Sequence, residues 1–244
     1  MRKDSPDVFA VRLTPPLLAR ADEVVQLLSS QVTPERLARI REVAARRSFG
    51  VVPVLEHLTD PFNTSAIMRS AEAFGVHRVE VIPEREQFLA APVSRGAHRW
   101  LELRRHDDGA SCARVLHEEG YEIFVATMEG ELGPRDLAAR EKVAVVFGNE
   151  HAGVSSALRE AADGTYAVPM SGFVESLNVS VAAAITLFEA TRGREGSITP
   201  EQHTRVVAQL LMSTVTHSDA IVREGLSGTA DAEDSGNPAQ APEG

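Results

Sequence analysis

From Val51 onward, short apolar runs rich in β-branched residues alternate with helical segments, and this alternation constrains the fold more than any other feature. The apolar runs include VVPVLEHL, RVEVIP, YEIFVAT and KVAVVFG, and segments such as NTSAIMRSAEAFG and GASCARVLHEEG separate them. Short strands interleaved with helices predict an α/β domain, in which a parallel sheet is covered by helices on both faces. In such sheets, ligands bind at the carboxyl ends of the strands.

The two ends of the chain predict different organisation. Residues 1–50 predict a short helical extension, because PPLLARADEVVQLLSS has helical apolar spacing and Thr33 is suited to cap a helix that begins at Pro34. The α/β domain with a C-terminal helix is expected over residues 51–217. Residues 218–244 are rich in Gly, Ala, Pro, Ser and acidic residues, which predicts a disordered acidic tail.

The charge balance disfavours nucleic-acid binding at first sight. The 244 residues include 25 Lys+Arg and 35 Asp+Glu, a formal net charge of −10. Arginines are nevertheless concentrated in residues 31–50 and again in residues 95–106. Affinity for a polyanion follows the phosphates that are neutralised locally, so each patch is a candidate contact surface, and an ordinary solvated helix face is the alternative.

The sequence also predicts where the protein works. No apolar stretch reaches the length of a membrane span, and the N-terminal MRKDSPDVFA lacks the apolar core of a signal peptide, so we expect a cytoplasmic protein without membrane contact. Cys112 is the only cysteine, which excludes an intrachain disulfide and disfavours a cysteine-based metal site. We therefore expect no metal.

The first loop of interest follows the strand at Val51. Pro61 ends that strand, Asn63 or Thr64 is expected to cap the next helix, and Gly75 ends it. Arg69 follows Asn63 by six positions, and we expect both side chains to point toward the same edge of the sheet. The alternative for Arg69 is a solvated or ion-paired helix residue.

The second loop follows the apolar strand that ends at Phe147. Gly148 lacks a side chain and would let a ligand approach the backbone. Glu150 at a strand end requires a partner, which indicates a site. The loop has neither the Gly-x-Gly-x-x-Gly nor the Gly-Lys-Ser/Thr pattern, and this disfavours a nucleotide hydrolase.

The third loop spans residues 168–181 and leads into a helix that is apolar round most of its circumference. Such a helix is expected to be deeply buried. Ser176 is a natural cap for it, and Asn178 is then expected in its first turn. Because a buried carboxamide needs partners, Asn178 is interpreted as a positioned hydrogen-bonding group.

Taken in order, NTSAIMRSAEAFG, FGNEHAGVS and VPMSGFVESLNVSV resemble the three motifs of the SpoU branch of the SPOUT RNA methyltransferases. The resemblance covers about Val51 to Arg194. It implies S-adenosylmethionine as methyl donor, a homodimer with the site at the subunit interface, and a C-terminal trefoil knot around the cofactor. The helical N-terminus and the arginines near Arg41 and Arg192 resemble the subgroup that methylates the 2′-hydroxyl of the D-loop guanosine, position 18, in tRNA. Other members of the family act on ribosomal RNA.

The resemblance also implies residue roles. The catalytic group is Asn63, Arg69, Glu150, Ser176 and Asn178. The cofactor-lining residues are Thr127, Gly148, Val168, Met170 and Leu177. The RNA-binding candidates are Arg36, Arg39, Arg41, Arg46, Arg95, Arg99, Arg192 and Arg194. Arg69 matches the residue credited with activating the 2′-hydroxyl. Because a guanidinium is a poor base near neutral pH, the alternative is that a charged Arg69 binds the adjacent phosphate and stabilises developing alkoxide, while solvent or a neighbouring group takes the proton.

Two other classes of function stay open. One is a non-catalytic RNA-binding relative, which the intact Asn63, Arg69, Glu150 and Asn178 disfavour. The other is a nucleotide-dependent α/β enzyme of unrelated mechanism, which the missing phosphate-loop glycines disfavour.

Overall fold

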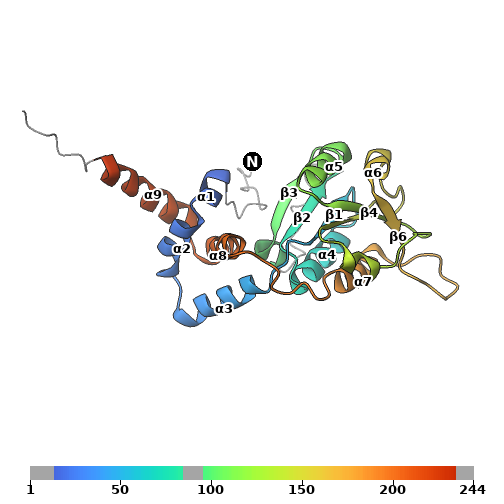
Figure 1. Cartoon of the computed structure of the whole chain (residues 1–244), viewed down its shortest axis with the longest axis horizontal. Coiled ribbons are helices and arrows are strands. Elements are labelled where there is room, and N and C mark those ends of the chain that lie inside the picture. The colour runs from blue at the N-terminus through green and yellow to red at the C-terminus, as the bar shows by residue number, and fades with distance from the viewer. Residues whose placement is uncertain (1–13, 85–95, 235–244) are drawn as a thin grey trace, which may run out of the picture. The chain divides into compact units, whose positions relative to one another are not determined.

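The computed structural model describes residues 14–84 and 96–234 of the chain (Figure 1). These residues divide into two compact units. One unit contains Ala45–Thr199 and holds the sheet. The other joins the N-terminal helices, up to Ala44, with the helices that follow Pro200.

In the first unit, six described strands form one parallel sheet in the order β3-β2-β1-β5-β4-β6. The strands are β1 (Val51–Glu56), β2 (Arg78–Ile82), β3 (Glu102–Arg105), β4 (Glu122–Ala126), β5 (Val143–Phe147) and β6 (Gly164–Tyr166). β1 pairs with β2 on one side and with β5 on the other. The predicted α/β fold with a parallel sheet is confirmed.

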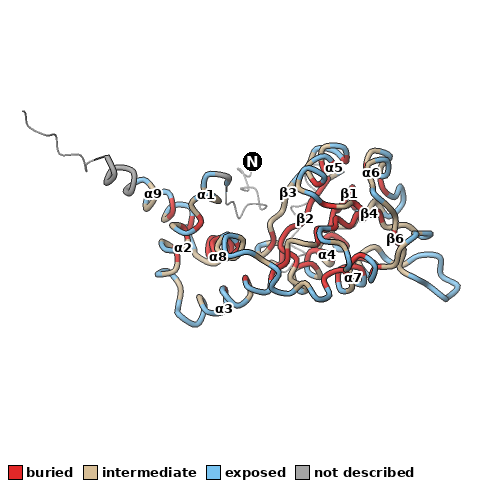
Figure 2. The backbone as a smooth tube through the Cα atoms, in the orientation of Figure 1, coloured by how far each residue is buried: buried red, intermediate tan, exposed pale blue. Residues whose placement is uncertain are grey.

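Helices cover both faces of this sheet. One face packs against α4 (Pro61–Ala73), α7 (Val179–Ala190) and the short η3 (Asp136–Ala139), and the other against α5 (Gly109–Glu118) and α6 (Ser156–Ala161). In β5, Val145 and Phe147 pack on the first face while Ala144 and Val146 pack on the second. Central strands are therefore buried on both faces, drawn red in Figure 2, which explains their unbroken apolar sequences.

The second unit is helical. It contains α1 (Pro15–Ala19), α2 (Ala21–Ser29), most of α3 (Pro34–Ala45), α8 (Pro200–Thr214) and α9 (Ser218–Asp234). Both α8 and α9 pack against α2, so the C-terminal helix that was expected to accompany the sheet groups with the N-terminal helices instead. No helix in the described ranges is both long and apolar enough to span a membrane.

Helix α9 occupies a stretch that the sequence predicted to be disordered, and over Ser218–Asp234 that prediction is wrong. Val222 is buried, Gly225 lies against the side chain of Leu27, and the Ser218 hydroxyl donates a 2.8 Å hydrogen bond to the carbonyl oxygen of Met212. A few apolar residues at helical spacing are enough to pack this helix against α2, and the mainly polar composition of the segment did not reveal them. Residues 235–244 lie outside the described residues.

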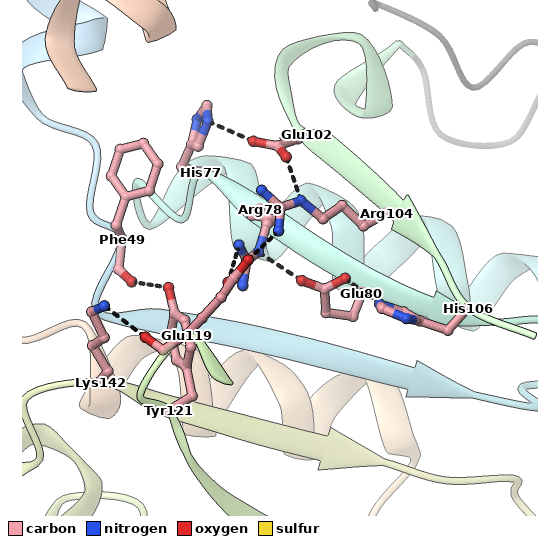
Figure 3. A network of polar contacts seen from close by, with 10 residues as sticks. All are labelled: Phe49, His77, Arg78, Glu80, Glu102, Arg104, His106, Glu119, Tyr121 and Lys142. Atoms are coloured by element: carbon pink, nitrogen blue, oxygen red, sulfur yellow. Dashed lines mark hydrogen bonds and ion pairs between the residues drawn. The ribbon is translucent and has the colours of Figure 1, made fainter. Parts of the chain in front are cut away.

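A cluster of charged side chains lies on β2, on and just after β3, and just after α5 (Figure 3). Glu80 is fully buried and contacts Arg78 at 2.6 Å and His106 at 2.7 Å. Arg104 pairs with Glu119, also at 2.6 Å. Part of the basic patch predicted over residues 95–106 is thus neutralised inside the fold.

Arg47, from the first arginine-rich segment, is also internal, with an exposed fraction of 1%. Its guanidinium donates to the carbonyl oxygens of Val76 at 2.8 Å and Trp100 at 3.3 Å, and it pairs with Glu72 at 2.9 Å. Arg47 therefore ties the segment before β1 to the end of α4 and to η2 (Ala97–Trp100).

Replacing Arg47 tests this structural role. We expect Arg47→Met to lower the free energy of unfolding by about 2 to 4 kcal/mol, because it leaves the Val76 carbonyl without its donor and Glu72 without its partner. Denaturant unfolding measures the change. The matched control is Arg46→Met at the exposed neighbouring position, where we expect a loss of about 0.5 kcal/mol or less. Equal losses in the two variants would contradict the structural role.

Candidate functional site

The carboxyl ends of β4, β5 and β6 and the start of α7 enclose a cavity of about 220 Å³. Its lining is formed by residues 126–128, 147–150, 153–154, 166, 168, 170, 176–177, 179, 182 and 186. All five residues expected to line the cofactor site border it: Thr127, Gly148, Val168, Met170 and Leu177. The third loop, which follows β6, thus meets the second loop, which follows β5.

Glycines shape the cavity wall after β5. A Cβ on Gly148 would lie 2.5 Å from the carbonyl carbon of Gly153, and Gly153 itself has φ +71°. Asn149 and Gly153 exchange backbone hydrogen bonds of 3.0 and 2.9 Å, which close the loop on itself. Gly148 was expected to make room for a ligand. In the structure, the absence of a side chain at Gly148 allows the backbone of Gly153 to pack directly against it.

A chain of hydrogen bonds, termed here the polar relay, joins the three loops. The Asn178 Nδ2 group donates to Asn63 Oδ1 at 3.1 Å, and Asn63 Nδ2 donates to Glu150 Oε1 at 2.8 Å. The other carboxylate oxygen, Glu150 Oε2, accepts from the Thr59 backbone N–H at 3.1 Å and from the Thr59 hydroxyl at 3.0 Å. Three of the five predicted catalytic residues therefore meet in one network.

The environment of Glu150 keeps its carboxyl group ionised. Partial desolvation alone would raise the pKa of Glu150, but the hydrogen bonds from Asn63 and Thr59 outweigh it and lower the pKa to about 2. An ionised carboxylate only accepts hydrogen bonds, so it orients the Asn63 amide with Nδ2 toward Glu150 and Oδ1 toward Asn178. Glu150 is thus a fixed acceptor near neutral pH.

The helix caps differ from those expected and explain how the relay forms. Asp60, not Asn63 or Thr64, caps α4 by accepting from the Phe62 N–H at 2.8 Å. Asn178, rather than Ser176, caps α7, and its Oδ1 accepts from the Ser180 N–H at 2.8 Å.

As a result, Asn63 lies in the first turn of α4 and is free of capping, so both ends of its amide serve the relay. The Nδ2 end of the Asn178 amide likewise remains available to Asn63. Ser176 lines the cavity.

Arg69 does not join this network. Its side chain is exposed on α4 and makes no hydrogen bond or ion pair with any residue that the structure describes, whereas Asn63 is buried. Six positions correspond to about one and two-thirds helical turns, so the two side chains leave α4 in different directions. The expectation that they point toward the same edge is wrong within one chain.

Most predicted RNA-contact residues are exposed. These are Arg36, Arg39 and Arg41 on α3, and Arg46, Arg99 and Arg192 in the sheet unit. Two of them form ion pairs with nearby acidic residues of the same chain: Arg39 with Glu42 at 2.7 Å and Arg192 with Glu189 at 3.2 Å. Arg95 lies outside the described residues.

Arg194 is directed inward, and for this residue the prediction of an RNA contact is wrong. Its guanidinium is half-buried and donates to backbone carbonyl groups around the end of α7, and burial lowers its pKa. The acceptors are the carbonyl oxygens of Gly50, Leu137, Ala138, Arg140, Glu141 and Ala190. Arg194 therefore fastens the end of α7 to the loops beneath it.

Two further residues belong to the site and were not predicted from the sequence. Thr59 supplies two donors to Glu150, and the Asn149 side chain donates to the His57 carbonyl at 2.7 Å while accepting from two N–H groups of its own loop. Each lies two or three residues after the carboxyl end of a strand, Asn149 after β5 and Thr59 after β1, and this position was the available signal.

A parallel sheet covered by helices on both faces, with a cavity at the carboxyl ends of its strands, is the arrangement in which α/β proteins bind ligands. The SpoU rRNA Methylase family model matches residues 50–188, and the chain belongs to this family.

Three known proteins illustrate the similarity. The tRNA (guanosine(18)-2′-O)-methyltransferase of Thermus thermophilus is 36% identical over 188 residues, which cover 73% of this chain and 97% of that protein. The crystal structure of the A. aeolicus TrmH/SpoU tRNA modifying enzyme has a TM-score of 0.67 and 27% identity, covering 75% of this chain and 98% of that one. The SpoU methyltransferase AviRb from Streptomyces viridochromogenes, in complex with the cofactor AdoMet, has a TM-score of 0.54 and 26% identity, covering 61% and 62%.

The low pKa of Glu150 predicts a specific pH dependence of stability. Because the pKa in the folded state, about 2, lies below that of an unfolded glutamate, the stabilisation from the carboxylate is complete above about pH 5 and is lost as the pH falls toward 2. The difference in unfolding free energy between wild type and Glu150→Gln should therefore be constant from pH 6 to 8 and shrink below about pH 4. Urea unfolding at a series of pH values measures it. A difference that changes between pH 6 and 8 would show that Glu150 titrates near neutrality.

Proposed function

We propose that this chain transfers a methyl group from S-adenosylmethionine to the 2′-hydroxyl of a ribose in structured RNA, and that the ribose is that of guanosine 18 in tRNA. The observation that carries the proposal is the convergence of the cofactor-type cavity and the polar relay at one sheet edge. The similarity to nearly the whole of the Thermus thermophilus enzyme favours tRNA. Ribosomal RNA, named in the description of the family, is the alternative substrate.

The cavity suits S-adenosylmethionine. Its wall is largely apolar, which fits an adenine ring, and backbone groups of residues 148, 168 and 170 are available for polar contacts. The Thr127 hydroxyl is buried and has no hydrogen-bond partner among the described residues, so a polar ligand atom would satisfy it. When bound, the cofactor supplies an electrophilic methyl group on a sulfonium.

The residues of the chain then have distinct tasks. Because a guanidinium is a cation with several hydrogen-bond donors, Arg69 binds an RNA phosphate and stabilises the alkoxide that develops on the 2′-oxygen, while the proton leaves to solvent or a neighbouring group. Glu150 holds the amide of Asn63, and Asn63 with Asn178 orients the ribose. Ser176 at the cavity wall supports this positioning.

A homodimer would complete the site. Arg69 is exposed on α4 away from the relay of its own chain, so in this proposal it serves the cavity of a second copy. The neighbouring surface suits such an interface, because α4 and α7 pack together and expose large apolar side chains. These are Phe62, Val181, Ile185 and Phe188, and the third loop adds Phe173 and Val174.

The remaining features fit the same proposal. A trefoil knot, in which the loop after β6 passes through the loops that wall the cavity, is part of the proposal, and membership of the SpoU family supports it. The exposed arginines of α3 provide an RNA-binding surface in a chain whose net charge is −10. A cytoplasmic location is proposed, where tRNA is available.

Methyl transfer to tRNA tests the function. The purified protein should place one methyl group on guanosine 18 of a tRNA transcript, located by mass spectrometry, and none on the same transcript carrying 2′-deoxyguanosine at that position. Arg69→Ala should reduce the rate by about 100-fold or more and leave the affinity for S-adenosylmethionine nearly unchanged. Arg114→Ala, on the exposed side of α5, is the control. Methylation of the deoxy transcript, or full activity of Arg69→Ala, would contradict the proposal.

The oligomeric state tests the dimer. Light scattering should give twice the 26.3 kDa mass of the chain for the wild type. Ile185→Glu places a charge in the exposed apolar face of α7 and should give monomers that lack methyl transfer. Glu160→Lys, an exposed charge change on α6 at the other face of the sheet, should remain dimeric. A dimeric and active Ile185→Glu variant would show that this face is not the interface.

A further inference from the structure

The turn that follows β1 contains an unusual backbone conformation at His57. Its φ is 50°, and among the described residues only His57 and His217 combine a side chain with positive φ. A residue with a Cβ is disfavoured in the left-handed region, so it stays there only when surrounding contacts fix it.

The backbone of His57 connects three elements. Its N–H donates to the carbonyl oxygen of Ile82, at the end of β2, at 2.8 Å. Its carbonyl oxygen accepts from Asn149 Nδ2 at 2.7 Å. Asn149 Oδ1 in turn accepts from the N–H groups of His151 and Ala152, both at 2.8 Å. The His57 carbonyl therefore anchors the side chain round which the loop after β5 is folded.

The residues beside His57 hold the same loop at other points. Thr59 holds the Glu150 carboxylate with its N–H and its hydroxyl. Glu56, which is fully buried, accepts from the Ser155 N–H at 2.8 Å and from the Ser155 hydroxyl at 2.6 Å. Hydrogen bonds with residues 56–59 thus fix residues 149–155 at both ends and at Glu150. The left-handed residue at 57 turns the chain so that the carbonyl of His57 and the donors of Thr59 face this loop.

We propose that His57 is a positioning residue that acts through its left-handed backbone and not through its imidazole. By setting the turn after β1, it fixes the loop that walls the cavity and carries Glu150. The importance of that loop for binding S-adenosylmethionine rests on the proposed function, but its fixation by the turn is a property of the chain alone.

Substitutions chosen by backbone preference separate the two roles of His57. Glycine and asparagine adopt positive φ readily, whereas the β-branched valine does not. We expect His57→Val to speed hydrogen exchange of residues 148–155 and to weaken S-adenosylmethionine binding, each by about 5- to 30-fold. His57→Asn and His57→Gly should stay within about 3-fold of wild type in both measurements.

The matched control is His217→Val, which places the same strain in the turn between α8 and α9. It should leave exchange of residues 148–155 and ligand affinity unchanged. If His57→Val fails to fold, Asn149→Asp serves instead, because it removes the Nδ2 donor to the His57 carbonyl and retains the Oδ1 acceptor. This variant should show the same faster exchange.

The possible outcomes decide between the explanations. Wild-type exchange in the Val and Asp variants would overturn the proposal, and so would an equal loss in the Asn, Gly and Val variants, since the imidazole would then be the important group. If the wild type does not bind S-adenosylmethionine at all, the proposed function fails, and hydrogen exchange still decides the role of His57.

Discussion

The hydrogen bonds around the Glu150 carboxylate are the constraint on which the site depends. Glu150 and Asn63 are 87 residues apart in the sequence, and Asn63 and Asn178 are 115 apart, yet one relay joins them. The parallel pairing of β1 with β5 brings the ends of these strands together, with Leu55 opposite Phe147, and so places their loops side by side. Because an ionised carboxylate only accepts hydrogen bonds, Glu150 accepts from Thr59 and from Asn63 Nδ2, which leaves Asn63 Oδ1 to accept from Asn178. The Glu150 carboxylate thus links the loop after β5 to Thr59 and to the Asn63–Asn178 pair, in addition to the contacts of that loop with His57 and Glu56.

Much of the fold and the cavity could be predicted because both follow from strand patterning. Strands buried on both faces have continuous apolar sequences, and the loops at their carboxyl ends form the ligand site. The residues taken from the resemblance, from Thr127 to Leu177, accordingly border one cavity. The helix caps could not be assigned in the same way. Asp, Asn, Ser and Thr can all cap a helix. Where several of them occur before a helix, the sequence does not show which residue is the cap and which side chains remain free to form hydrogen bonds in the site.

The direction of individual side chains and the packing of helix α9 could not be predicted from the sequence either. Arg47 lies in an arginine-rich segment and Arg194 lies two residues after Arg192, but both guanidinium groups donate hydrogen bonds to backbone carbonyls of the fold. Arginine has five donors and a long apolar stem, so it suits a buried junction of loop carbonyls as well as it suits a phosphate. Helix α9 is the converse case, since its composition suggested disorder while Val222 and Gly225 supply the contacts that dock it. The average composition of a segment does not show the few positions by which it packs against the rest of the protein.

The most direct test of the central claim is a crystal structure of the protein with S-adenosylhomocysteine, the demethylated cofactor. We expect the adenosine to occupy the cavity between Thr127, Gly148 and Leu177, and the hydrogen bonds from Asn178 to Asn63 and from Asn63 to Glu150 both to be present. A ligand bound at another place, or an Asn63 amide turned away from Glu150 in the complex, would contradict it.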